Sequence, residues 1–165
     1  MKHTISLLVE NKFGVLARIA GLFSARGYNI ASLAVSETLD PSISYMTVVV
    51  EAKDEAVLEQ VKKQLNKLID IITITVFTKK EHIDRELVLV KVNYTAKDKA
   101  KLEGLLDKYV AKIIEHKTDT AIIEAVGEQA QVKQLLEALQ QFGIKELVRT
   151  GRIAIAGIQK GERNA

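Results

Sequence analysis

One order of strands and helices occurs twice in the sequence, and it limits the folds that are open to the chain. In the first half, an apolar run at residues 4–9 predicts a strand, and apolar residues with helical spacing follow it. Two alternating segments, 30–37 and 44–51, predict strands joined by a turn at Pro41. A helix capped by Asp54 and a strand at 71–77 complete the order β-α-β-β-α-β. The apolar residues of the two helices are Val15, Leu16, Ile19, Leu22 and Phe23, then Leu58, Val61, Leu65 and Leu68.

The second half returns to the same order from Arg85 onward. Its expected elements are a strand from Arg85, a helix at 96–110, strands at 111–116 and 120–126, a helix at 128–142, and a strand within 145–156. Each half therefore predicts an α+β, ferredoxin-like βαββαβ domain, in which two helices cover one face of a four-stranded antiparallel sheet.

We expect two domains in the 165 residues. Residues 1–78 form the first domain, 79–85 form a charged linker, and 86–165 form the second. Domains of this size bury only a modest fraction of their surface, so each is expected to pack against another domain or a second chain.

Composition restricts the function classes. The hydrophobic share of 47% and the charged share of 27% are those of a folded globular protein. The 24 Lys and Arg residues nearly balance the 21 Asp and Glu residues, and they form no basic block, which disfavours nucleic-acid binding. The absence of cysteine excludes disulfides and thiolate metal sites. We expect no membrane segment and a cytoplasmic protein, because the N-terminus has neither a long apolar run nor an Arg-rich presequence.

The sequence shows no catalytic or metal-binding constellation. His3, His82 and His116 lack a second ligand at helical spacing, so we expect all three to be solvated. The glycines do not have the spacing of a phosphate-binding loop. An RNA-recognition domain would need stacked aromatic residues, but the first and third strands offer only Tyr45. A small acyl-phosphate hydrolase would need an arginine in the loop after the first strand, and "ENKFG" has none.

Two asparagines and a glycine flank the first helix. Gly14 would let a ligand approach the helix N-terminus, where unpaired N–H groups suit a carboxylate. Asn11 could accept a hydrogen bond from an ammonium group, and Asn29 could complete the site if a second copy brought it near. An amino acid carries both groups. The same residues also fit an ordinary turn, an N-terminal cap and a left-handed Asn29, and physics alone favours that second interpretation.

A resemblance to a known family helps to decide between an amino-acid site and an ordinary turn. The segment "ENKFGVLARIAGLFSARGYNIASLAVSET" resembles the amino-terminal ACT domain of the small, regulatory subunits of acetohydroxyacid synthase, also called acetolactate synthase. The resemblance extends through "MTVVV", "QLNKLIDI", "RELVLVKV" and "RTGRIAIAG", and so covers nearly the whole chain. An Asn-x-x-Gly-x-Leu turn followed by Asn-Ile is common to ACT domains, whereas Gly27-Tyr28-Asn29-Ile30 with the later blocks in order is specific to these subunits.

The resemblance implies a non-catalytic chain with no cofactor of its own. Its partner would be a catalytic large subunit that carries thiamine diphosphate, Mg²⁺ and FAD and works in branched-chain amino acid synthesis. The small subunit would activate that enzyme and confer feedback inhibition by L-valine. ACT domains would pair edge to edge into a homodimer, with the effector at the interface. The implied effector-binding residues are Asn11, Gly14, Val15 and Leu16 of one chain and Asn29 and Ile30 of the other.

Two other function classes fit the sequence less well. A stand-alone amino-acid-sensing ACT regulator would need an output segment such as a DNA-reading helix, and none remains after two sheets are assigned. A stand-alone enzyme would need an acid, a base or a nucleophile in a shared site, and the sequence shows none.

Overall fold

The computed structural model describes residues 2–51, 55–77 and 82–158. The chain divides into two compact units, of which the first contains residues 1–83 and 152–165 and the second contains 84–151. The predicted α+β class with ferredoxin-like βαββαβ units is confirmed. The predicted boundary at the C-terminal end is different, because residues from Arg152 onward return to the first unit instead of completing the second.

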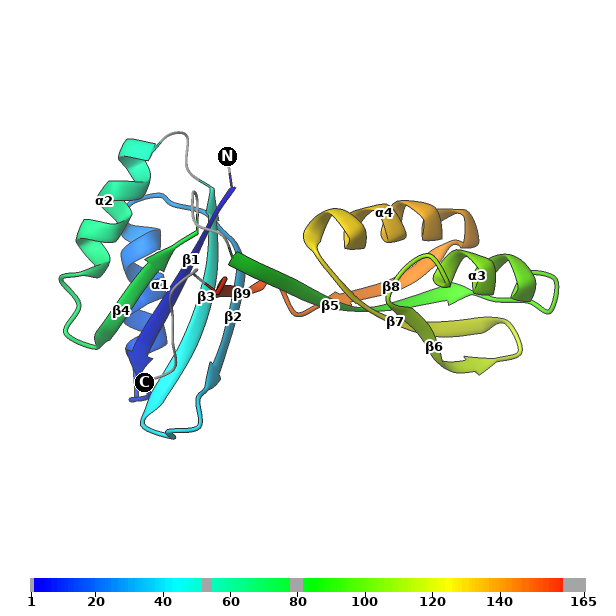
Figure 1. Ribbon diagram of the computed structural model, residues 1–165, viewed down its shortest axis with the longest axis horizontal. Coiled ribbons are helices and arrows are strands. Elements are labelled where there is room, and N and C mark those ends of the chain that lie inside the picture. The colour runs from blue at the N-terminus through cyan, green and yellow to red at the C-terminus, as the bar shows by residue number, and fades with distance from the viewer. Residues whose placement is uncertain (1, 52–54, 78–81, 159–165) are drawn as a thin grey trace. The chain divides into compact units, whose positions relative to one another are not determined.

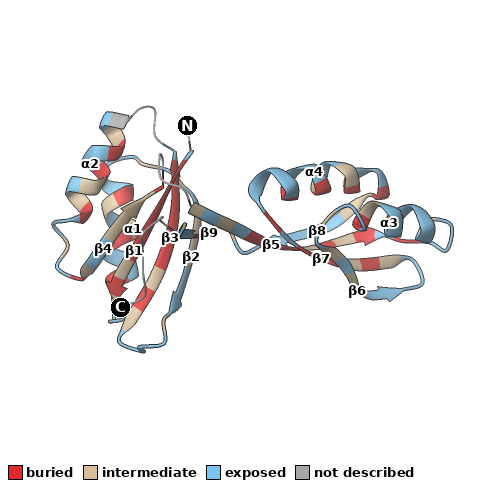
Figure 2. Ribbon diagram, in the orientation of Figure 1, coloured by how far each residue is buried: buried red, intermediate tan, exposed pale blue. Residues whose placement is uncertain are grey.

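The first unit is built on an antiparallel sheet with the strand order β2-β3-β1-β4. Helices α1 and α2 cover one face of this sheet (Figure 1), and Figure 2 shows buried residues on both the helices and the strands, which form one core cluster. The central strand β1 presents Ile5, Leu7 and Val9 to the helices, as expected from its alternation. The elements are β1 (Lys2–Glu10), α1 (Val15–Ala25), β2 (Ile30–Glu37), β3 (Ile43–Glu51), α2 (Glu55–Leu65) and β4 (Ile71–Val76).

Helix α1 is held at both ends by glycines with left-handed backbone. Gly14 is the N-cap residue with φ of +82°, and Gly27 has φ of +68°. At the C-terminal end, the N–H of Tyr28 donates to the carbonyl of Phe23 and the N–H of Gly27 donates to that of Ser24, both at 3.0 Å. This is a Schellman motif, and it ends the helix without help from Asn29. The expectation of a left-handed Asn29 is wrong, because only glycines have positive φ among the described residues.

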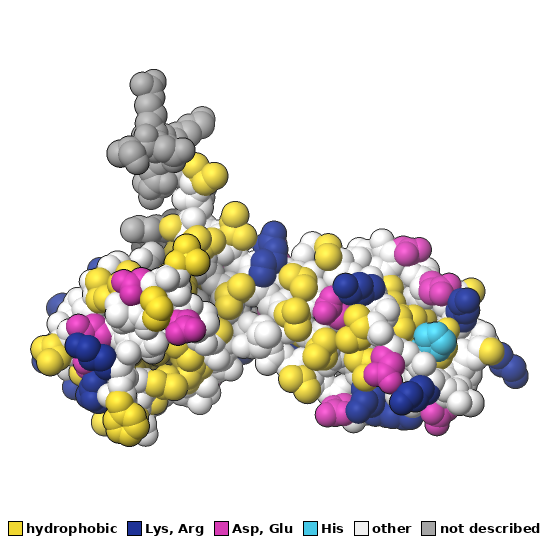
Figure 3. Space-filling model, turned by 90° about the horizontal axis from the view of Figure 1, so that it is seen from below, with side chains coloured by type: hydrophobic (Ala, Val, Ile, Leu, Met, Phe, Trp, Pro, Cys, Tyr) yellow, Lys and Arg dark blue, Asp and Glu magenta, His cyan; other side chains and the backbone are white. Residues whose placement is uncertain are grey.

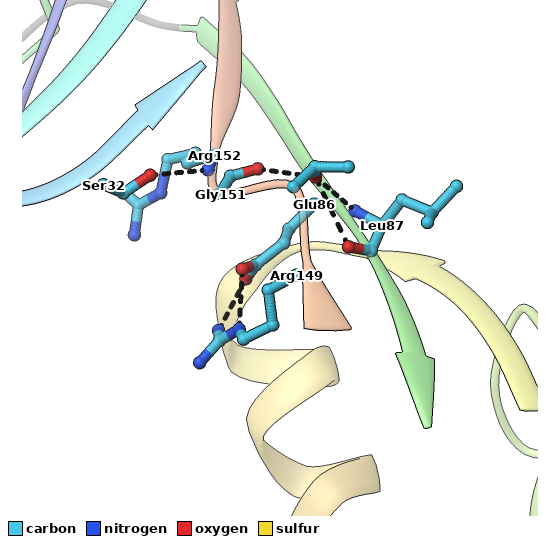
Figure 4. Close-up of polar contacts among 7 residues, drawn as sticks. Ser32, Glu86, Leu87, Arg149, Gly151 and Arg152 are labelled. Atoms are coloured by element: carbon cyan, nitrogen blue, oxygen red, sulfur yellow. Dashed lines mark hydrogen bonds and ion pairs between the residues drawn. The ribbon is translucent and has the colours of Figure 1, made fainter. Parts of the chain in front are cut away.

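The second unit repeats this architecture on a sheet with the path β6-β7-β5-β8. Helices α3 and α4 cover one face, and the core between them includes Val90, Leu102, Ile123 and Leu135. Arg149 at the end of β8 donates to both carboxylate oxygens of the buried Glu86, at 2.8 and 2.7 Å (Figure 4). The elements are β5 (His82–Asn93), α3 (Lys99–Leu106), β6 (Ala111–Lys117), β7 (Thr120–Gly127), α4 (Gln129–Leu139), the 3₁₀ turn η1 (Gln140–Phe142) and β8 (Ile144–Arg149).

Several elements differ from their predicted lengths. Helix α3 ends at Leu106 instead of residue 110, because Lys108 and Tyr109 donate to carbonyls three residues back, which tightens the chain into turns. The expected last strand is two strands, β8 and β9 (Ile153–Ala156), with Gly151 at φ +78° between them. The expected N-cap Asp54 and most of the expected linker lie outside the described residues.

The expectation of three solvated histidines is wrong for His3 and right for His116. His3 is only 6% exposed because it shares the inner face of β1 with Ile5, and its ring nitrogens have no hydrogen-bond partner within the described residues. The His82 ring stacks on Phe77 at 4.9 Å, and His82 lies in β5 instead of a linker. His116 is exposed, but it lies in strand β6.

The outer face of the first sheet is covered by the returning segment at Arg152 to Ala154. Five hydroxyl groups on β1, β2 and β3 hold its backbone and its Arg152 side chain. Ser32 accepts from the Arg152 N–H at 3.0 Å (Figure 4), and Thr4 accepts from the guanidinium at 2.9 Å. Ser6 and Tyr45 both donate to the carbonyl of Ala154, and Thr47 accepts from its N–H. These contacts are the reason that the C-terminal segment belongs to the first unit.

No described helix has both the length and the apolar character that a membrane span requires.

Removing both donors to the Ala154 carbonyl should destabilise the protein. We expect the double variant Ser6→Ala, Tyr45→Phe to lower the free energy of unfolding by about 1–3 kcal/mol, because a buried carbonyl would lose its partners. Urea unfolding measures this value. The control is Tyr28→Phe, since the half-buried Tyr28 hydroxyl makes no hydrogen bond within the described residues. An equal loss in both variants would contradict the role given to the hydroxyls.

Candidate functional site

A pocket of about 300 Å³ lies in the first unit, between the start of α1 and the end of β2. Its apolar lining comes from one helix turn and three strands, and its polar lining comes from strand ends and the turn after β1. The apolar residues are Val9, Val15, Leu16, Val35 and Met46, and the polar residues are Glu10, Asn11, Lys12, Ser36, Glu37 and Ser44. Three of the expected effector residues, Asn11, Val15 and Leu16, therefore meet in one hollow.

Asn11 is fixed by two hydrogen bonds to the turn between β2 and β3. Its N–H donates to the carbonyl of Ser42 at 2.7 Å, and its side-chain amide donates to the carbonyl of Pro41 at 2.8 Å. Because the amide nitrogen is used in this way, the amide oxygen is left to accept from a ligand. This arrangement agrees with an ammonium-binding role, and it also makes Asn11 a structural link between two loops.

Gly14 does not line the pocket. A Cβ at this position would meet the Arg18 guanidinium at 3.0 Å, and Arg18 in turn donates to the nearly buried Asp70 at 2.8 Å. The reason for glycine here is its φ of +82°, which strains an L-residue with a side chain. Gly14 thus sets the direction in which α1 leaves the turn.

The first turn of α1 presents free backbone donors beside the pocket. The N–H groups of Leu16 and Ala17 have no hydrogen-bond partner in the part of the chain that the structure describes. They carry the positive end of the helix dipole, and such donors suit a carboxylate. Gly14 contributes by shaping the cap from which these donors project.

Of the two glutamates at the pocket, one forms an ion pair and the other does not, among the described residues. Lys12 forms an ion pair with Glu10 at 2.9 Å, and the hydrogen bond to Glu10 together with its charge raises the pKa of Lys12 above its ordinary value. Glu37 also lines the pocket, and it has no ion-pair partner within residues 2–51, 55–77 and 82–158. A cationic group of a ligand would therefore find two acceptors here, the Glu37 carboxylate and the Asn11 amide oxygen.

The remaining two expected effector residues lie elsewhere. Asn29 and Ile30 are at the start of β2, whereas the pocket is at its end, beside Val35 to Glu37. Seven residue steps along a strand span roughly 23 Å. The structure therefore does not bring Asn29 and Ile30 to Asn11 within one chain.

Sequence reasoning missed part of the pocket lining. Val35 and Met46 face each other across the β2–β3 pair, and Glu37 pairs with Ser44. Alternation placed Val35 on one face of its strand, but only the strand register brings it beside Met46 and α1. Within the described residues, no three His, Asp or Glu side chains gather as a metal site.

Comparisons with known proteins agree along the whole chain. Residues 5–73 match the family described as AHAS small subunit-like ACT domain, and residues 85–158 match that described as the small subunit of acetolactate synthase. A "Probable acetolactate synthase small subunit" of Archaeoglobus fulgidus is 46% identical, over 94% of this chain and 96% of the relative. The acetolactate synthase small subunit of Bacillus subtilis is 38% identical, over 94% of this chain and 91% of its own.

A solved structure gives the same result. The chain is similar to the acetolactate synthase small subunit of Thermotoga maritima, with a TM-score of 0.87 and 33% sequence identity. The match covers 97% of this chain and 99% of that one. Both units are therefore shared with this relative.

Replacing Gly14 by alanine should destabilise the protein, and the same change at Gly21 should not. At Gly14 an alanine is forced to a positive φ, which costs about 1–2 kcal/mol. Gly21 lies inside α1 with open space around it, so alanine there should stabilise by about 0.5–1 kcal/mol. Thermal and urea unfolding of the two variants measure the difference. If both variants matched the parent, the backbone account of Gly14 would be wrong.

Proposed function

The chain belongs to the family of acetolactate synthase small subunits, and from this we propose that it activates a separate catalytic subunit and confers feedback inhibition by L-valine. The observation that carries the proposal is the agreement of both halves, in order, with that family. The second half matters because a free-standing amino-acid sensor would not need it. The sensor therefore remains the less favoured alternative.

The pocket supports an amino acid as the effector. The free N–H groups of Leu16 and Ala17 would receive the carboxylate. The Asn11 amide oxygen and the Glu37 carboxylate would receive the ammonium group. The apolar lining would hold the side chain, and its branched members Val15 and Val35 suit an isopropyl group.

A second copy of the chain would complete this site. β2 lies at the edge of its sheet. If two β2 strands pair antiparallel across a two-fold axis, the start of one strand lies opposite the end of the other. Asn29 and Ile30 of one chain would then approach the pocket of its partner. A site shared between two chains therefore explains why Asn29 and Ile30 lie far from the pocket of their own chain. We propose that the protein forms a homodimer.

The chemistry of the synthase would belong to the partner. We propose that thiamine diphosphate, Mg²⁺ and FAD are bound by the catalytic subunit in the cytoplasm. This chain would activate the catalytic subunit by binding to it. L-valine would inhibit the enzyme by changing either the affinity of the two subunits for each other or the activity of their complex.

The first test is calorimetric titration of the purified chain with L-valine, using D-valine and L-leucine as controls. We expect saturable binding of L-valine to the parent and its loss in Gly14→Asp, because the new carboxylate would compete for the helix N-terminus. The matched control is Gly14→Asn, which has the same shape and tolerates a left-handed backbone but carries no charge. Repulsion of about 1.4 kcal/mol between the introduced carboxylate and the carboxylate of valine would weaken binding tenfold. The valine affinities of Gly14→Asp and Gly14→Asn should therefore differ by about tenfold or more. Equal affinities would place the carboxylate elsewhere.

Mixed dimers test whether two chains share the site. A dimer of one Asn11→Ala chain and one Asn29→Ala chain should keep one intact site of two, because both changes fall in the same pocket. Titration should then show half the parent's valine stoichiometry with unchanged affinity. Loss of all binding, or two weakened sites, would contradict the two-chain arrangement.

A further inference from the structure

Three loops at one end of the first sheet each present a fully exposed apolar side chain. Phe13 follows β1, Leu39 is in the β2–β3 turn, and Ile69 is in the turn before β4. Their exposed fractions are 103%, 105% and 95%. The view in Figure 3 faces this end of the unit, where apolar side chains project among single charged ones. We call these three residues the apolar tip.

The end of β1 brings the three loops together. The N–H of Glu10 donates to the carbonyl of Asp70 at 2.9 Å, and the N–H of Asn11 donates to that of Ser42 at 2.7 Å. One loop therefore lies on each side of the turn that carries Phe13. Because of the strand order, the loop that carries Phe13 lies between the loops that carry Leu39 and Ile69.

Internal hydrogen bonds hold each loop in shape. In the β2–β3 turn, Asp40 accepts from the N–H and the hydroxyl of Ser42, and these bonds lower the pKa of the Asp40 carboxyl below its ordinary value. In the turn before β4, the N–H of Ile71 donates to the carbonyl of Leu68. Side chains on such preformed loops lose little freedom when a partner binds them.

Two cations near the apolar tip are already paired within the chain. Lys12 pairs with Glu10 at 2.9 Å, and Arg18 pairs with Asp70 at 2.8 Å. These two cations are therefore not free for a partner surface, and the natural complement of the three exposed side chains is apolar pockets. Single exposed apolar residues are ordinary on protein surfaces, but three at one end on ordered loops indicate an interaction site.

We propose that the apolar tip docks into apolar pockets on the catalytic subunit of the synthase. This inference rests on the proposed function, which supplies the partner. A second copy of this chain is the less suitable occupant, because edge-to-edge pairing along β2 brings it to one side of the sheet, whereas Phe13 and Ile69 adjoin β1 and β4, the two strands farthest from β2. The tip adjoins the effector pocket, since Lys12 precedes Phe13 and Glu37 lies two residues before Leu39.

The test measures binding of the full-length chain to the purified catalytic subunit of the same organism by biolayer interferometry. The variants are Phe13→Ser, Leu39→Ser, Ile69→Ser and the triple change. The matched control is Val110→Ser, a 76% exposed apolar residue in a turn of the second unit. Each tip variant should weaken binding by about tenfold and the triple variant by about a hundredfold or more, whereas the control should leave it unchanged. Thermal unfolding and valine titration of every variant should match the parent.

Three outcomes would overturn the inference in different ways. Parent-like affinity of the triple variant would show that the apolar tip is not the docking surface. Loss of the dimer in sedimentation velocity, with unchanged affinity for the catalytic subunit, would assign the tip to a second copy. If the parent chain itself did not bind the catalytic subunit, the proposed function would fail, and the docking proposal would fail with it.

Discussion

The hydrogen bonds at the end of β1 are the contacts on which the functional half of the molecule depends. β1 is an inner strand of its sheet, and where it ends, the N–H groups of Glu10 and Asn11 bind the carbonyls of Asp70 and Ser42. Asn11 adds a side-chain bond to Pro41. These three bonds join loops that are distant in sequence, and they fix the turn from which α1 leaves at Gly14. The pocket wall and the apolar tip are both made of residues from these loops.

Local patterns in the sequence were sufficient for most of the first unit. The bounds of β2 agree with its predicted range, and α1 begins and ends where Gly14 and the Schellman motif require. The covered outer face could not be predicted in this way. Thr4, Ser6 and Thr47 alternate with apolar residues, which is typical of a solvated face, but they are buried because Arg152 to Ala154 lie on them. Nothing within a short window of β1 indicates a partner almost 150 residues away.

For the candidate site, the sequence predicted the residues that are close together in the chain and missed those that only strand pairing brings near. The Asn-x-x-Gly turn located Asn11, Val15 and Leu16 at the pocket, because they are close in sequence to the helix start. Val35, Glu37 and Met46 were missed because their nearness depends on strand pairing. The structure also assigns Gly14 another role than the expected one: its missing side chain serves the backbone angle of the cap, and Gly14 is not among the residues that line the pocket.

The shared loops would give a physical route between the proposed effector and the proposed partner. An effector changes the affinity for a partner only if it binds one loop arrangement better than another. Asn11 lines the pocket and holds the turn that carries Leu39, while Phe13 is two residues beyond it. A shift of Asn11 toward a bound ammonium group would therefore move two of the three residues of the apolar tip. Because such coupling is reciprocal, docking of the proposed catalytic partner would change the affinity for the proposed effector by the same factor, typically 5- to 150-fold. The effect of the effector on subunit binding and the effect of the subunit on effector binding would then be two measurements of one coupling free energy.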